Sequence, residues 1–159
     1  MKIITYLFLI LLAFFLSLVD TSFLSFLPIY SATILLTVSV IITFALVGFQ
    51  KAALIFAAFA VLFYTCFSSL PPIFLAASFL ILPLLIVYLK KMAIFETGRY
   101  FIFLIYFFSF LILGLALIIL AADFSPSVFL TLFSFATINT LAGLAVFFIV
   151  RTIKSKLFI

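Results

Sequence analysis

Few side chains in this sequence could carry out chemistry, and they lie far apart along the chain. The 159 residues include three acids, one cysteine and no histidine. The acids are Asp20, Glu96 and Asp123, and the thiol is Cys66. General acid–base catalysis needs carboxylates that converge in one dry pocket. A histidine-based triad or a His/Cys metal cluster cannot be assembled from this composition. We therefore expect a non-enzymatic protein with no catalytic residue, no metal site and no cofactor.

Two groups of small or polar residues share helix faces and are the candidate interface residues. Asn139 is the most polar residue inside any apolar segment. One face has the spacing i, i+3, i+4 and i+7 and consists of Ala136, Asn139, Thr140 and Gly143. The other has the spacing i, i+4 and i+7 and consists of Ala53, Ala57 and Ala60. Small residues let membrane helices approach closely, and an amide can hydrogen-bond across the contact. Each face could close the bundle on itself or receive a partner or a substrate.

The composition identifies the class of protein that must position these residues. The chain is 71% hydrophobic and 7% charged, whereas soluble domains are about 45–50% apolar and about 25% charged. Its mean hydropathy is +1.73. Eleven charged side chains (eight basic and three acidic) cannot cover a water-soluble core. The composition excludes a soluble domain, a disordered segment and a disulfide-built secreted module.

Six apolar segments are long enough to cross a bilayer as helices, because a span needs about 17–25 residues. They cover residues 3–19, 30–49, 52–70, 72–89, 100–122 and 128–150. Membrane β-strands alternate apolar and polar residues, and these segments do not. The predicted fold is an all-α integral membrane protein, a compact bundle of about six transmembrane helices forming one domain over residues 1–159. We expect no charged residue inside a span, with Asp20 and Asp123 solvated at span ends.

The basic residues predict the orientation of the bundle. All eight lie in segments 1–2, 50–51, 90–99 and 151–159, which alternate with segments 20–29, 71 and 123–127, where no base occurs. By the positive-inside rule, both termini are cytoplasmic. The bases are interpreted as topology determinants that touch anionic headgroups, with no nucleic acid as partner. The C-terminal tail carries three of them, Arg151, Lys154 and Lys156, fewer than the four to eight typical of a lipid-recognition cluster.

Two short breaks predict how the central spans are connected. The apolar sequence is interrupted at residues 48–51 and again at residues 68–72. Interruptions this short permit only tight turns, so the second, third and fourth spans should form a close antiparallel group. Pro83 lies inside the fourth span, where proline removes a backbone donor and favours a kink.

Residues 44–91, FALVGFQKAALIFAAFAVLFYTCFSSLPPIFLAASFLILPLLIVYLKK, resemble the bacterial rod shape-determining protein MreD family. Gly48, Phe49 and Lys51 match its inner turn, and Ser68, Ser69 and Pro71 match its outer turn. The sequence departs from the family pattern at three places. Alanines stand where the family has glycines, Tyr64-Thr65 replaces an Asp, and Pro28 is not followed by Asp.

The resemblance implies a component of the cell-elongation (rod) complex in the bacterial inner membrane. Its partners would be an MreC-like single-span protein and other membrane proteins of that complex, which link a cytoskeletal filament to peptidoglycan synthesis and maintain cell shape. The family fold is also similar to the substrate-binding subunits of energy-coupling-factor transporters. A small-molecule-binding subunit of such a transporter is therefore the alternative function.

Overall fold

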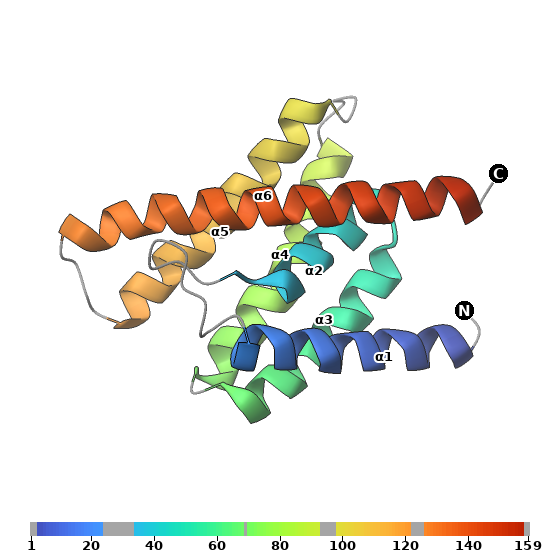
Figure 1. Ribbon diagram of the computed structural model, residues 1–159, viewed down its shortest axis with the longest axis horizontal. Helices are drawn as coiled ribbons and strands as arrows, with labels where there is room; N and C mark the ends of the chain where they lie inside the picture. The colour runs from blue at the N-terminus through green and yellow to red at the C-terminus, as the bar shows by residue number, and fades with distance from the viewer. Residues whose placement is uncertain (1–2, 24–33, 69, 93–97, 122–125, 158–159) are drawn as a thin grey trace.

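The computed structural model describes residues 3–23, 34–68, 70–92, 98–121 and 126–157 (Figure 1). Within these ranges the chain forms six α-helices and one short π-helix, which confirms the predicted all-α class. The elements are α1 (Ile3–Leu18), the π-helix η1 (Val19–Phe23), α2 (Leu36–Val47), α3 (Gln50–Phe67), α4 (Pro72–Met92), α5 (Arg99–Ala121) and α6 (Pro126–Leu157). Pro83 lies inside α4, which the structure assigns as one helix from end to end.

Five of the helices are long and apolar enough to cross a membrane, and α2 is not. At 1.5 Å per residue, the 12 residues of α2 extend about 18 Å, against about 30 Å of hydrocarbon. The predicted second span, 30–49, is therefore too long. Its helix begins only at Leu36, and residues 30–33 lie outside the described part of the chain. The other predicted spans agree with the helices to within a few residues, except that α6 continues to Leu157.

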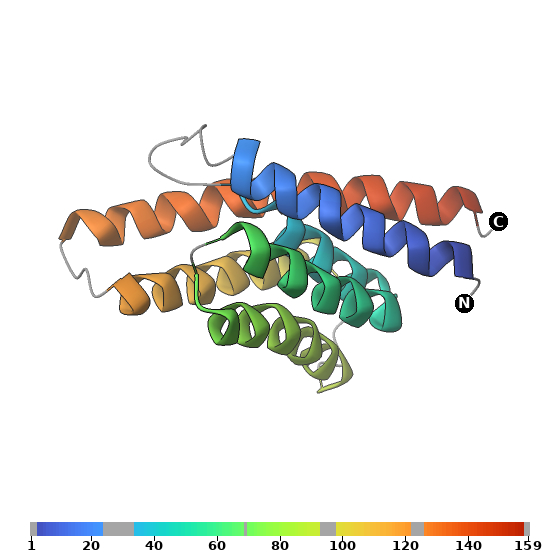
Figure 2. The same cartoon turned by 90° about the horizontal axis from the view of Figure 1, so that it is seen from below.

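The short helix α2 is the centre of the bundle. It contacts each of the other five α-helices, and nine of its 12 residues are buried. Figure 2 shows α1 and α6 along one side of the molecule and α4 along the opposite side, with α2, α3 and α5 between them. Because most of α2 is buried in the bundle, the backbone groups at its two ends need partners from the protein.

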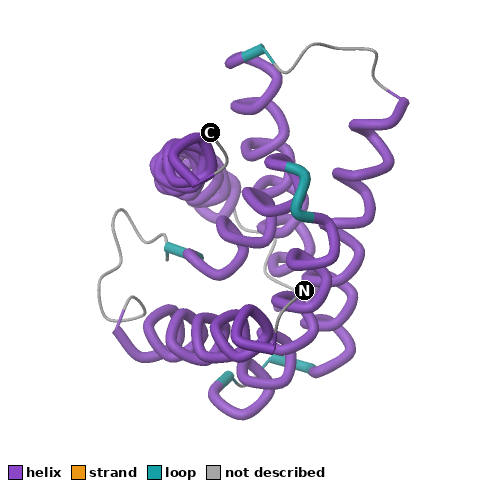
Figure 3. Tube along the Cα trace, turned by 90° about the vertical axis from the view of Figure 1, so that its right-hand side faces the viewer, coloured by secondary structure: helices purple, strands orange, loops and turns teal. Residues whose placement is uncertain are grey.

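A tight turn joins α2 to α3. Gly48 adopts φ +98° in the left-handed region, and its N–H donates to the Phe44 carbonyl at the C-terminus of α2. A residue with a Cβ is disfavoured in this conformation, so glycine suits the helix end. Helices α2, α3 and α4 all contact one another, which confirms the predicted close packing of the three. Of the three, α2 packs against α6, which Figure 3 shows nearly end-on beside the C label.

The outer surface of the bundle is apolar. Large side chains on several helices are mostly exposed, including Ile4 at 77%, Ile73 at 84% and Leu130 at 76%. Contiguous apolar surface of this kind is rare on soluble monomers, and here it covers helices of membrane-spanning length. The chain is a multi-pass membrane protein. The first turn of α1 and the last turn of α6 lie at the same end of the bundle (Figure 1).

Candidate functional site

The most polar cluster in the bundle surrounds the N-terminus of α2, and Asp20 is its centre. Asp20 lies in η1, the π-helical continuation of α1, and only 5% of its surface is exposed. The expectation of a solvated Asp20 in an outer loop is therefore wrong, as is the expectation that no span carries a charge. The predicted solvation of Asp123 falls on a residue outside the described part of the chain.

The Asp20 carboxylate caps the N-terminus of α2. Oδ1 accepts the Leu36 N–H at 3.0 Å, and Oδ2 accepts the Thr37 N–H at 2.9 Å. The Tyr64 hydroxyl of α3 donates to the same Oδ2 at 2.8 Å. The N-terminus of a helix carries partial positive charge and unsatisfied N–H groups, so a carboxylate there is stabilised by the dipole and by hydrogen bonds. Asp20 thereby joins α1, α2 and α3.

Asn139 completes this cap from α6. Its Oδ1 accepts the Leu35 N–H at 2.6 Å, and its Nδ2 donates to the Phe135 carbonyl at 2.9 Å. The side chains of Asp20 and Asn139 thus satisfy three consecutive backbone donors. The sequence singles out Asn139 as the most polar residue within a span. It gives no signal for its partner, because Leu35 is 104 positions away.

Two further polar features lie close to this cap. Within the described residues, the buried Ser17 hydroxyl has no hydrogen-bond partner. In the middle of α2, the Thr43 and Tyr106 hydroxyls are 2.5 Å apart, and Thr43 also donates to the Ser39 carbonyl. These contacts tie α5 to α2 through one tyrosine. The sequence does not distinguish Tyr64 and Tyr106 as members of this network, since they stand among many apolar aromatic residues.

The opposite end of α2 is held by two cations. Lys90 Nζ donates to the Leu46 carbonyl at 2.8 Å, and Lys154 Nζ donates to the Val47 carbonyl at 2.9 Å. Lys154 also lies 5.0 Å from the centre of the Phe49 ring. The C-terminus of a helix carries unpaired carbonyls and partial negative charge, which ammonium groups stabilise. One carboxylate and two ammoniums therefore match the dipole of this buried helix.

Both predicted small-residue faces lie inside the bundle. Ala53, Ala57 and Ala60 have no exposed surface, and neither do Ala136, Asn139 and Thr140. A Cβ built on Gly143 would lie 2.5 Å from two ring carbons of Tyr106. The faces permit close packing within this chain. The chain's own helices cover both faces, and the partner contact expected at one of them stays a prediction.

A groove between α4 and α5 remains open on the outside of the bundle. Its volume is about 320 Å³. The residues that line it are mostly apolar or small, among them Ala77, Ser78, Ile81, Ser109, Ile112 and Ala116. Ser78 on α4 is half-buried and Ser109 on α5 is only 9% exposed, so the groove presents little polar surface. The signal in the sequence, small residues at helical spacing, is weak here because it is spread over two helices.

The described residues offer little for catalysis. Asp20 is the one acid among them, no three His, Cys, Asp or Glu side chains gather there to hold a metal ion, and Cys66 is exposed on α3. The Asp20 oxygens already accept three hydrogen bonds from the chain itself. Comparisons with protein-family models, with curated proteins and with solved structures find no match to this chain.

Proposed function

We propose that this protein is a non-enzymatic membrane component of the bacterial cell-elongation complex, and that it acts by binding the single span of an MreC-like partner. The inner membrane is its proposed location. The resemblance of residues 44–91 supports the family role, and the apolar groove between α4 and α5 supports binding of another helix. The groove is the observation that carries the proposal, because it is a packing surface that the chain leaves uncovered.

The chemistry of the groove suits a transmembrane helix. Helices in lipid gain little from the hydrophobic effect, and they associate through close packing at small residues and through a few hydrogen bonds. Ala77 and Ala116 leave space for a close approach, and the half-buried Ser78 carries a hydroxyl that can bond to a partner. The polar side chains inside the bundle bond mainly to one another and to α2, which favours a structural role over a catalytic one.

Filling the groove tests the proposal. Ala77 is exposed on the groove wall, so Ala77→Leu adds bulk there without entering the core. Ala58 is an exposed alanine on α3, and Ala58→Leu is the matched control. The full chain is co-expressed with an MreC-like single-span protein from the same genome and purified by a tag on one of them. Ala77→Leu should lose most of the partner, and Ala58→Leu should retain it.

Equal recovery of the partner with both variants contradicts the groove as the docking site. Absence of the partner from the wild-type preparation contradicts the elongation role itself. Size-exclusion chromatography should show both variants as monodisperse as the wild type, because neither residue belongs to the core.

A second candidate function is favoured by α2. Helices that begin inside the membrane, with N-termini directed at anionic groups, are a feature of substrate sites in transporters. In this chain the N-terminus of α2 is directed at the carboxylate of Asp20, with Asn139 beside it, so a ligand would bind there by displacing these two side chains. A substrate-binding subunit of an energy-coupling-factor transporter would use this region for its ligand.

Direct binding distinguishes the two candidates. The purified full chain is screened with water-soluble vitamins by isothermal titration calorimetry, with Asp20→Asn as the comparison. Micromolar binding that the variant loses would favour the transporter subunit. Partner co-purification without vitamin binding would favour the elongation component.

A further inference from the structure

The end of the bundle where α2 terminates is basic and lacks an acid among the described residues. Lys90 and Lys91 lie in the last turn of α4, and Arg151 and Lys154 lie near the end of α6. Lys90 of α4 and Lys154 of α6 both reach the C-terminal carbonyls of α2. Asp20 bonds to the other end of α2, about 15 Å away by helix rise. The structure thus gathers bases that the sequence places in two separate segments.

Within the described residues, Arg151 and Lys91 are the two cations of this group that have no partner, and Arg151 is the one that lines a hollow. Lys90 and Lys154 are engaged by the carbonyls of Leu46 and Val47. Arg151 stands one helical turn before Lys154, is exposed, and makes no hydrogen bond or ion pair within the described residues. Its guanidinium offers five N–H donors in a planar fork that matches a phosphate group.

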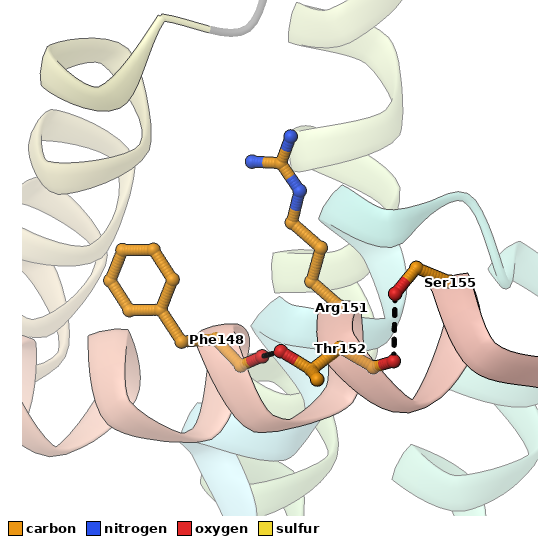
Figure 4. Close-up of a pocket in the computed structure, with 4 residues that line it drawn as sticks. All are labelled: Phe148, Arg151, Thr152 and Ser155. Atoms are coloured by element: carbon orange, nitrogen blue, oxygen red, sulfur yellow. Dashed lines mark hydrogen bonds between the residues drawn. The ribbon is translucent and has the colours of Figure 1, made fainter.

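Arg151 lines a hollow whose polarity changes along α6. The hollow has a volume of about 320 Å³ and is lined by Phe148, Arg151, Thr152 and Ser155. Figure 4 shows the Arg151 side chain projecting away from the α6 ribbon, with Phe148 one turn earlier. Phe148 is 52% exposed. The order of an apolar ring followed by a cation and two hydroxyls matches the order of an acyl chain and a phosphate at a membrane interface.

The hydroxyls in the hollow are already committed as donors. Thr152 Oγ1 donates to the Phe148 carbonyl and Ser155 Oγ donates to the Thr152 carbonyl, each at 2.8 Å (Figure 4). The donors available to an anion are therefore those of Arg151. We propose that this hollow binds an anionic phospholipid, with Arg151 bonded to the phosphate and the upper acyl chain against Phe148. The neighbouring Lys90 and Lys154 add positive potential that a zwitterionic lipid would use less well.

Lipid retention tests this site in the full chain. The protein is purified in mild detergent and exchanged with phosphatidylglycerol or phosphatidylcholine of equal chain length, and bound lipid is counted by native mass spectrometry. Wild type should retain phosphatidylglycerol in preference to phosphatidylcholine. Arg151→Gln should weaken this retention about tenfold, the value expected for one lost charge-assisted contact. Lys51→Gln is the matched control, because Lys51 is exposed and lines a different hollow; it should retain the lipid.

Three outcomes would overturn the proposal. Equal losses with Arg151→Gln and Lys51→Gln would indicate diffuse attraction to the basic end and no defined site. If millimolar inorganic phosphate displaces the bound lipid as effectively as added phosphatidylglycerol does, the hollow is a site for the free anion. Unchanged lipid retention in Phe148→Ala would exclude the acyl contact. Both arginine and lysine variants should keep the wild-type melting temperature, since both side chains are exposed.

Discussion

Asp20 places a carboxylate where a helix begins inside the protein. An unsatisfied backbone N–H in hydrocarbon costs several kcal/mol, and α2 presents three such groups at Leu35, Leu36 and Thr37. Asp20 and Asn139 accept all three. The buried charge is in turn stabilised by the helix dipole and by the Tyr64 hydroxyl. Removal of the Asp20 side chain would leave the Leu36 N–H, the Thr37 N–H and the Tyr64 hydroxyl unpaired.

Substitution of Asp20 should therefore lower stability in two steps. Asp20→Asn keeps one acceptor and loses the charge, so we expect a loss of about 1–3 kcal/mol in the free energy of unfolding. Asp20→Ala removes every acceptor and should cost about 3–5 kcal/mol. Thr137→Ala is the control, because the exposed Thr137 hydroxyl donates to the Phe133 carbonyl of its own helix. Thermal unfolding in detergent measures the series; wild-type stability of Asp20→Asn would contradict the capping role.

The sequence reveals these residues unequally. Asn139 is visible because an amide is rare within an apolar helix, whereas Asp20 falls at the end of an apolar segment, where a loop acid is the simpler interpretation. The π-helical turn that directs its carboxylate inward leaves no mark in the composition. Tyr64 is equally hidden, since its role follows from the position of Asp20, 44 residues earlier.

Among the elements, α2 differs most from its prediction. Residues 30–49 are apolar throughout, and an apolar run indicates burial without indicating where a helix starts. The start at Leu36 depends on side chains from α1 and α6, which no local pattern encodes. The turn at Gly48 is different, because the glycine required by φ +98° is local information. The existence of the helices and the tight turns could thus be predicted, but the residue at which α2 begins could not.

The approach of α6 to α5 depends on Gly143. A side chain there meets the Tyr106 ring, and that ring is held by the Thr43 hydroxyl. Gly143→Leu should lower the free energy of unfolding by about 1–3 kcal/mol through overpacking. Ala145→Leu adds a leucine to an exposed position of the same helix and should change stability little.

Ala57 provides the same test in α3. Because it is fully buried, Ala57→Leu should destabilise the bundle, with exposed Ala58→Leu as its neighbour control. A lower melting temperature for Gly143→Leu than for Ala145→Leu, and for Ala57→Leu than for Ala58→Leu, supports the packing of both faces within the chain. Stable, well-folded proteins with either buried leucine would contradict it.

For the molecule as a whole, the bases predict the orientation, and the structure groups several of them. Lys90 and Lys154 meet at one end of α2 although 64 residues separate them in the chain. The charge pattern predicts the side of the membrane on which each base lies, because the positive-inside rule acts on every loop. It does not reveal which bases hold α2 and which remain free.

Cysteine labelling tests the orientation. Single cysteines at Ser22, Thr97 and Ser125 are introduced in a Cys66→Ala background, and intact cells are treated with an impermeant thiol reagent. Thr97 and Ser125 lie outside the described residues, and their sides follow from the charges alone. Positions 22 and 125 should react and position 97 should not. Labelling at 97, or silence at both 22 and 125, would invert or reject the topology.

Crosslinking in cells tests directly the proposal that the α4–α5 groove receives the single span of an elongation-complex partner. A photoreactive amino acid replaces Ala77 in the groove or Ala58 on α3, and crosslinked products are identified by mass spectrometry. We expect position 77 to capture the MreC-like single-span protein and position 58 not to capture it. Capture of lipid alone at position 77, or equal capture at both positions, would contradict it.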